Sequence, residues 1–164
     1  MTPEDYYHTK VRDIITSVVE ALNADSKRRF SQTEMYYFER WWNEQNQTTR
    51  ENVRKLVDSG QLEFINGGWV ASDEATPSYE EIILNMMTGH QFLKRNFGVV
   101  PKHAWHADAF GHSAAMVELF SQMGFHSISF ARINDAEKAD RKANKELEFI
   151  WKPEFESDSG PSTS

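Results

Sequence analysis

The chain has 164 residues, 39% of them hydrophobic, which is enough for one compact domain with a sizeable core and too few for two domains of ordinary size. Its formal net charge of −7 argues against a nucleic-acid or anionic-membrane partner, because both require a basic surface. It contains no cysteine, which excludes disulfides and thiolate chemistry within these residues, and no run approaches the roughly 18 apolar residues of a membrane span.

The first part of the chain predicts helices and strands in alternation. Apolar residues between Tyr6 and Asn23 recur at spacings of three and four, which is typical of an amphipathic helix. Short apolar and β-favouring runs predict two strands, with two helical patterns between them. We therefore expect strands over Arg29 to Met35 and Gln61 to Asn66, a helix whose Trp41 and Trp42 pack against the sheet, and a helix over Thr49 to Ser59 that ends at Gly60.

The second part continues the same pattern. Ser78, followed three residues later by Glu81, indicates a helix N-cap, and the helical pattern runs on to Gly98. We then expect a strand over Ala104 to Ala107, a helix over Ala114 to Met123, and a strand over Phe125 to Ile133. The charged residues from Asp135 to Asn144 indicate a surface helix or loop, and those from Glu154 to Ser164 a disordered polar tail.

This alternation predicts parallel βα units rather than a β-sandwich. The pattern contains about four strands, whereas a closed (β/α) barrel needs about 250 residues. Periodicity therefore leaves two architectures open, an open doubly wound sheet and a part of a barrel. In both, the working end is the edge at which the strands finish.

Two polar segments follow predicted strands and should share this edge: Gly67-Gly68-Trp69 with Asp73-Glu74, and His106 to Ser113. Asp108 is the best placed carboxylate, because it ends a strand just before a helix N-terminus, where backbone amides favour the ionised form. An ionised aspartate can act as a nucleophile or a metal ligand. The alternative is that Asp108 merely caps the helix that starts near Ser113.

The same segment offers a possible chelate. His106 and Asp108 are two residues apart, so on a strand they share a face and, with His112, could hold one zinc ion, although such spacing also arises by chance. Three aromatic residues near the edge are either sugar-stacking platforms or packing residues: Trp69, Trp105 and Phe110.

Several strings of this sequence resemble the α-mannosidases of glycoside hydrolase family 38. The run from Trp105 to Ser113, WHADAFGHS, is similar to the W-x-I-D-P-F-G-H-S segment of those enzymes. Other matching strings follow in the family's order and spacing, over about Tyr6 to Trp151: Arg28-Arg29-Phe30 with Glu34 and Trp41-Trp42, Leu62 to Val70 with Asp73-Glu74-Ala75, and Gln122 to Phe125. The chain looks closest to the lysosomal branch, as an internal piece of the catalytic N-terminal domain.

The resemblance implies a retaining, zinc-dependent glycosidase with a seven-stranded β/α barrel, in which zinc holds the 2- and 3-hydroxyls of mannose. Asp108 matches the nucleophile, which in the family is also a zinc ligand. Phe110 matches the aromatic residue beside the metal-bound sugar, and Arg132 an arginine that pairs with the nucleophile. Retention also needs an acid/base carboxyl about 5 to 5.5 Å from the nucleophile, and no residue here matches it.

The chain departs from the family pattern in what it lacks. The H-x-H-x-D segment that supplies a histidine and an aspartate to zinc is expected before Tyr6, and the last zinc histidine and the acid/base after Trp151. Asp108 is thus the one zinc ligand of four expected here, and His106 is not a ligand by family analogy. Ala109 replaces the usual proline, which removes a rigid turn but no functional group.

We therefore expect residues 1–153 to form a partial family 38 barrel with about four βα units, and residues 154–164 to form the polar tail. The parent would be an α-mannosidase that acts on mannose-containing glycans, and the isolated chain would be inactive. The alternative is a non-catalytic glycan-binding or degenerate truncated paralogue. The chain has no signal-peptide pattern, and the Asn46-Gln47-Thr48 sequon favours a lysosomal or other endomembrane parent if it is used.

Overall fold

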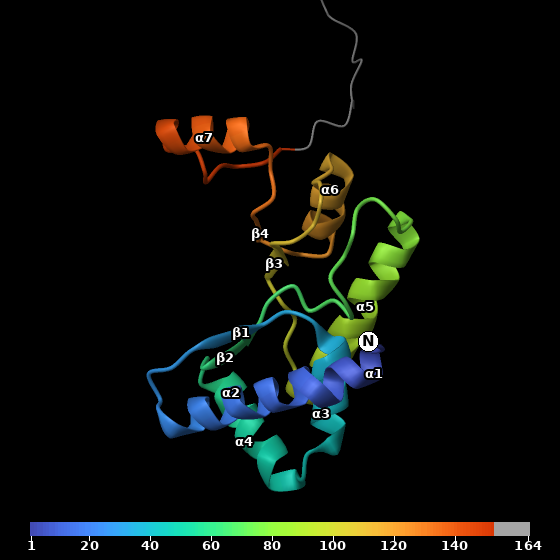
Figure 1. Ribbon diagram of the computed structural model, residues 1–164, viewed down its shortest axis with the longest axis vertical. Coiled ribbons are helices and arrows are strands. Elements are labelled where there is room, and N and C mark those ends of the chain that lie inside the picture. The colour runs from blue at the N-terminus through green and yellow to red at the C-terminus, as the bar shows by residue number, and fades with distance from the viewer. Residues whose placement is uncertain (153–164) are drawn as a thin grey trace, which may run out of the picture.

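The computed structural model describes residues 1–152, so the expected polar tail over 154–164 lies outside the described residues. Its elements follow the predicted order, and Figure 1 shows how they are arranged. In chain order they are α1 (Pro3–Tyr6), the π-helical turn η1 (Tyr7–Val11), α2 (Arg12–Ala24), β1 (Phe30–Gln32), α3 (Met35–Glu44), α4 (Gln47–Asp58), β2 (Leu62–Phe64), α5 (Tyr79–Phe97), β3 (His103–His106), α6 (Ala114–Gln122), β4 (Ser127–Phe130) and α7 (Asp135–Asn144).

The predicted helix boundaries are confirmed where a cap defines them. The Ser78 hydroxyl accepts from the Glu81 N–H, and the Glu81 carboxylate accepts from the Ser78 N–H, which forms the capping box at the start of α5. Gly98 ends that helix in the left-handed conformation, with φ of 71°. Met35 was expected in a strand, and this was wrong, because it is the first residue of α3.

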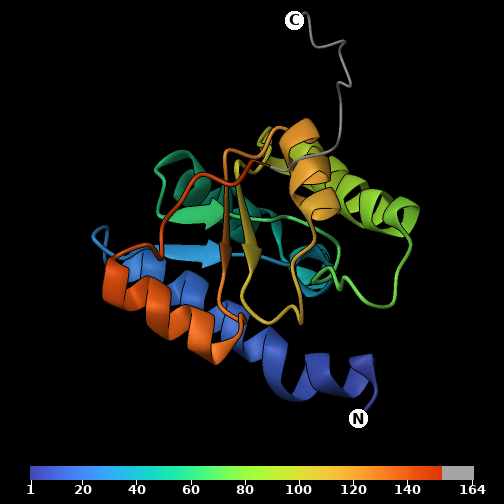
Figure 2. The same cartoon turned by 90° about the horizontal axis from the view of Figure 1, so that it is seen from above.

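The four strands form two parallel pairs, as the βα pattern predicted. In one pair Phe30 lies opposite Leu62, and in the other His103 lies opposite Ser127. Figure 2 shows that the two pairs run in clearly different directions. The described residues are thus α/β with short parallel strands, and they do not by themselves close a barrel.

Asn66 joins the two pairs. This residue is buried and left-handed, with φ of 57°, and it follows β2. Its N–H donates to the His103 carbonyl at 2.7 Å, and its side-chain oxygen accepts from the Trp105 N–H at 3.2 Å. Asn66 therefore joins the end of β2 to β3 by two hydrogen bonds, although these two strands do not form a regular ladder with each other.

The glycines after Asn66 allow α5 to approach the loop closely. A Cβ atom built on Gly89, in the middle of α5, would lie 2.0 Å from the Gly67 carbonyl oxygen. Gly67 itself has φ of 76°, and a Cβ there would lie 2.6 Å from the Pro101 side chain. The loop that carries the polar segment after β2 is therefore fixed against α5 by backbone contact.

Two hydrophobic clusters form the core. The larger one includes two residues of β2 together with Trp41 and Trp42, which are 1% and 2% exposed. The two tryptophans are buried, but their side-chain contacts are with helices: the Trp41 indole donates to the Thr16 hydroxyl of α2, and the Trp42 ring lies 4.7 Å from that of Phe97 in α5. The smaller one lies under β3 and β4 and consists of Ile82, Met86, Ala104, Met116, Phe120 and Phe125. Helix α5 contributes residues to both clusters, so it connects the two halves of the molecule.

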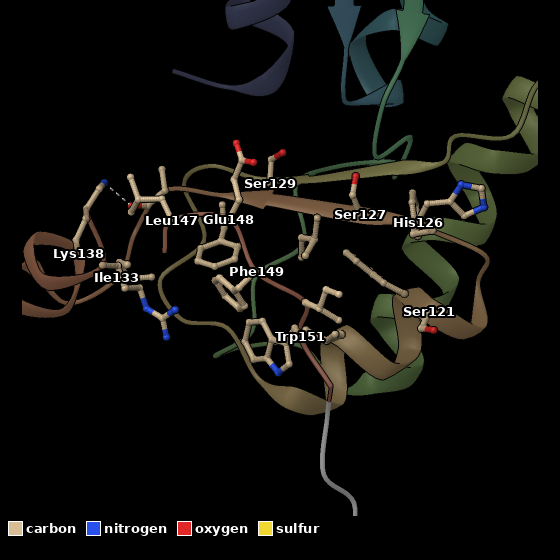
Figure 3. A pocket seen from close by; sticks show the side chains of 18 residues that line it. Ser121, His126, Ser127, Ser129, Ile133, Lys138, Leu147, Glu148, Phe149 and Trp151 are labelled. Carbon is tan, nitrogen blue, oxygen red and sulfur yellow. Dashed lines mark hydrogen bonds between the residues drawn. The ribbon is translucent and has the colours of Figure 1, made fainter. Parts of the chain in front are cut away.

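The far side of β4 is less fully covered. A groove of about 740 Å³ lies between β4, α6 and the segment that carries Leu147, Phe149 and Trp151. Figure 3 shows the side chains that line it. Helix α7 has no buried residue, and Figure 1 shows it apart from the main body. Among residues 1–152 no helix combines the length and apolar character needed to cross a membrane.

Candidate functional site

A pocket of about 300 Å³ opens at the edge where β1, β2 and β3 end. The two polar segments that were expected to share this edge do so. The pocket is lined by Thr33 and Glu34 after β1, Asn66 and Ala71 to Asp73 after β2, and Trp105 to Phe110 at the end of β3.

Arg132 contacts both Asp108 and Phe110 at this edge. The Arg132 Nε donates to Oδ1 of Asp108 at 2.6 Å, and a second guanidinium nitrogen contacts the same oxygen. The guanidinium also lies over the Phe110 ring, 4.7 Å from its centroid. All three remain open to solvent, since Phe110 is 73% exposed and the Asp108 side chain 79% exposed. Arg132 therefore links the carboxylate to an exposed aromatic face.

Asp108 does not cap the following helix, so that alternative was wrong. The N-cap of α6 is Ser113, whose hydroxyl accepts from the Met116 N–H at 3.1 Å. Within residues 1–152 the hydrogen bonds and ion pairs of the Asp108 side chain go to Arg132 alone. Its carboxylate is thus left available for chemistry at the pocket.

A second group of polar side chains is buried beside the first. Glu74, His106 and His112 each offer one ligand atom within 4.8 Å of the others. Oε1 of Glu74 lies 4.0 Å from Nδ1 of His106 and 3.9 Å from Nδ1 of His112. The side chains are 10%, 1% and 7% exposed, respectively. The two histidines therefore lie with Glu74, and not with Asp108 as their spacing in the sequence predicts.

The sequence comparisons decide the family. Residues 1–158 match the family described as the glycosyl hydrolases family 38 N-terminal domain. The chain belongs to this family. It is 42% identical to the lysosomal alpha-mannosidase of Dictyostelium discoideum over 92% of this chain and 16% of that protein. It is 45% identical to the lysosomal alpha-mannosidase of Cavia porcellus over 90% of this chain and 15% of that protein.

Solved structures agree on the fold. An alpha-mannosidase from Enterococcus faecalis V583 aligns with 80% of this chain and 15% of its own, with a TM-score of 0.69 at 17% identity. A likeness at that identity shows the fold alone. The chain spans about one sixth of the length of the curated relatives that it matches.

Burial shifts the pKa of two groups in this family 38 site. Burial, together with the nearby His112, lowers the pKa of His106 to about 4, so its imidazole is neutral near pH 7. Burial also raises the pKa of the Glu34 carboxyl, which lines the same pocket as Asp108. The pocket thus places an exposed carboxylate beside a carboxyl that resists ionisation.

The expected aromatic platforms separate into two kinds. Trp105 is 45% exposed and, with Phe110, lines the pocket. Trp69 instead packs on the larger core cluster, edge-on to Tyr36 at 5.8 Å, and is a packing residue.

Asp73 and Glu74 make different hydrogen bonds after β2. The Asp73 carboxylate accepts from the Thr76 hydroxyl at 2.7 Å and from the Glu74 N–H, so it shapes its own loop. Oε2 of Glu74 accepts from the Ser113 N–H at 2.5 Å, which ties this loop to the start of α6. No local sequence pattern predicts that contact, because the two residues are 39 positions apart.

Proposed function

We propose that this segment forms part of the catalytic domain of a retaining, zinc-dependent α-mannosidase, with Asp108 as the nucleophile. The observation that carries the proposal is the contact of Arg132 with both Asp108 and Phe110 at the strand edge of a family 38 chain. The names of the relatives, which are α-mannosidases, support mannose-containing glycans as the substrate class.

The geometry at Asp108 suits attack on a sugar. Arg132 contacts Oδ1, so the guanidinium orients the carboxylate while Oδ2 has no hydrogen bond among residues 1–152. In the proposed first step a carboxylate oxygen of Asp108 forms a bond to the anomeric carbon as the bond to the leaving oxygen breaks, and an acid/base outside this chain gives that oxygen its proton. Water then releases the mannose from Asp108, with the same group as base. Phe110 offers its exposed ring to the apolar face of the sugar.

Asp108 is compatible with a zinc ligand, because carboxylate oxygens bind this ion and Asp108 is accessible. One carboxylate does not hold zinc alone, since sites of this kind use three or four protein donors. The other donors of the family's site would come from polypeptide outside these residues. An ion bound there would coordinate the 2- and 3-hydroxyls of the mannose.

The larger assembly is part of the proposal. The parallel pairs β1 with β2 and β3 with β4 would be four strands of the seven-stranded barrel that the family resemblance implies. The lysosomal relatives favour a lysosomal or other endomembrane location for the parent. Asn46 lies at an exposed position, where a glycan could be attached in that compartment.

The first test compares the 164-residue chain with the longer protein that we propose contains it. Both are assayed on a chromogenic α-mannoside with added zinc. We expect turnover by the longer protein and none by the 164-residue chain, which lacks the acid/base. Turnover by the short chain at the rate of a full enzyme would refute this assignment.

The second test is Asp108→Asn in the longer protein, with Asp58→Asn as the control. We expect Asp108→Asn to reduce kcat by a factor of at least about 10³, in line with the loss of other catalytic carboxylates. Asp58→Asn should leave kcat unchanged, because Asp58 is the exposed last residue of α4 and does not line the pocket of Asp108. Full turnover by Asp108→Asn would eliminate Asp108 as the nucleophile.

A further inference from the structure

The buried group of Glu74, His106 and His112 leaves four polar atoms without partners among residues 1–152. They are Oε1 of Glu74, both ring nitrogens of His106, and Nδ1 of His112. A buried polar group without a hydrogen bond costs about 1 to 3 kcal/mol, and more when it is charged. One unpartnered atom of each side chain lies within 4.8 Å of the other two, and this cluster of three indicates a missing partner.

The hydrogen bonds around the group fix which atoms face that point. Nε2 of His112 lies 3.1 Å from the Arg132 carbonyl oxygen. A carbonyl only accepts, so Nε2 is the nitrogen that donates to it. In a ring with a single proton, Nδ1 then has a bare lone pair. That lone pair lies 3.9 Å from Oε1 of Glu74, which is also an acceptor. Two acceptors cannot satisfy each other, but a cation between them satisfies both.

The same bonds are those that support metal ligands in proteins. A ligating histidine commonly donates its other ring nitrogen to a backbone carbonyl, as His112 does to Arg132. A ligating carboxylate is commonly held by a second hydrogen bond, as Oε2 of Glu74 is by the Ser113 N–H. Glu74 and His112 are thus each held by one hydrogen bond, which leaves one atom of each side chain free to bind a metal ion.

From this arrangement we propose a second divalent-cation site, for a Zn²⁺-like ion, formed by Oε1 of Glu74 and Nδ1 of His106 and His112. Two imidazoles and one carboxylate are a donor set that zinc accepts, with a fourth position open. Donors about 2.0 to 2.1 Å from a tetrahedral ion lie about 3.3 to 3.4 Å apart. The separations here are 4.0 Å, 3.9 Å and at most 4.8 Å, so the side chains need to close by roughly 0.5 to 1.5 Å, which rotation of the rings allows.

This site is distinct from the zinc position proposed at Asp108, and it would serve a different purpose. Its ligands come from the loop after β2, the last residue of β3 and the loop before α6. His106 and His112 lie on either side of Asp108 in the chain. An ion bound to both would fix the ends of the segment that carries the nucleophile and tie it to the loop of Glu74.

The test uses the 164-residue chain without a histidine tag, stripped of metal and titrated with Co²⁺, whose visible absorption reports the ligand geometry. We expect one equivalent to bind with the intense absorption of a four- or five-coordinate ion, and Zn²⁺ to displace it. His106→Gln and His112→Gln should each weaken binding by at least about 100-fold, since loss of a supporting residue alone costs 10- to 100-fold. A hundredfold excess of Zn²⁺ over Kd should raise the Tm of the wild-type chain by about 5 to 10 °C.

Two matched variants keep the result specific. Asp108→Asn removes the carboxylate between the two histidines, and His126→Gln removes an exposed imidazole; both should bind Co²⁺ like the wild type. A wild-type chain with native circular dichroism that binds no stoichiometric Co²⁺ overturns the proposal. Binding that survives His106→Gln and His112→Gln, or that is lost in Asp108→Asn, overturns it as well.

A second measurement covers the case in which a histidine variant fails to fold. X-ray absorption of the cobalt-loaded wild-type chain should show two imidazole ligands, and a count of one or none refutes the site. The longer protein should hold two ions, of which Asp108→Asn removes one. If instead the longer protein holds a single ion and Asp108→Asn removes it, this second site is eliminated. The assignment of Asp108 as the nucleophile is unaffected by that result.

Discussion

Replacing Asn66 tests the junction that holds the two strand pairs together. In Asn66→Ala the Trp105 N–H loses its acceptor in a partly buried place, which costs about 1 to 3 kcal/mol. Alanine must also adopt the left-handed conformation with φ of 57°, which costs about 1 to 2 kcal/mol. The free energy of unfolding should therefore fall by about 2 to 5 kcal/mol.

Asn66→Gly separates these two contributions. Glycine loses the same side-chain hydrogen bond but adopts the left-handed conformation without strain. The unfolded chain is more flexible with glycine than with alanine at this position, which lowers the free energy of unfolding by about 0.4 to 1 kcal/mol. We therefore expect Asn66→Gly to be less destabilising than Asn66→Ala by roughly 1 kcal/mol.

The assay is urea denaturation of the 164-residue chain, followed by far-ultraviolet circular dichroism and by tryptophan fluorescence. The Trp105 N–H bonds to Asn66, so a movement of the end of β3 should change the contribution of this residue to the fluorescence. The reasoning would be refuted if both variants unfolded within about 0.5 kcal/mol of the wild type, a difference typical of a surface substitution. It would also fail if glycine were the worse of the two.

Further predictions concern α5 and the pH dependence of stability. Gly89→Ala should destabilise the fold by at least about 3 kcal/mol in the same assay, because its Cβ would lie 2.0 Å from a backbone oxygen. Gly98→Ala, with φ of 71° and open space around it, should cost only about 1 to 2 kcal/mol, and equal losses for the two would contradict the packing described here. Burial lowers the pKa of His90 below its ordinary 6.5, so the unfolded chain takes up a proton before the native one as pH falls. The free energy of unfolding should therefore decrease as pH falls below 6.5, with a smaller decrease in His90→Gln; identical profiles from pH 7 to pH 5 would rule out this contribution.

Local signals in the sequence predicted the elements well. The capping box of Ser78 with Glu81 and the end of the helix at Gly98 depend on local residues, and the structure has both. Strand ends were less predictable, because β1 is short and Met35 fits either a strand or the first turn of α3. Apolar character alone does not distinguish these states when a helix starts three residues after a strand ends.

The candidate site was predictable only in part. The position of Asp108 at the end of a strand followed from the βα pattern, whereas the roles of Arg132 and Phe110 came from the family resemblance alone. The contact of Glu74 with both histidines depends on the path of two loops that are fixed by backbone contacts elsewhere, including the approach of Gly89 to Gly67. Neither composition nor spacing encodes such a path.

The central claim is that Asp108 forms a covalent bond to the sugar. The most direct measurement treats the longer protein with a fluorinated mannosyl fluoride that slows hydrolysis of the glycosyl-enzyme, digests the protein, and locates the added mass by tandem mass spectrometry. We predict one modified peptide, labelled on Asp108, and no label there in Asp108→Asn. A label on another carboxylate, with Asp108 unmodified in an enzyme that the reagent inactivates, would contradict the assignment.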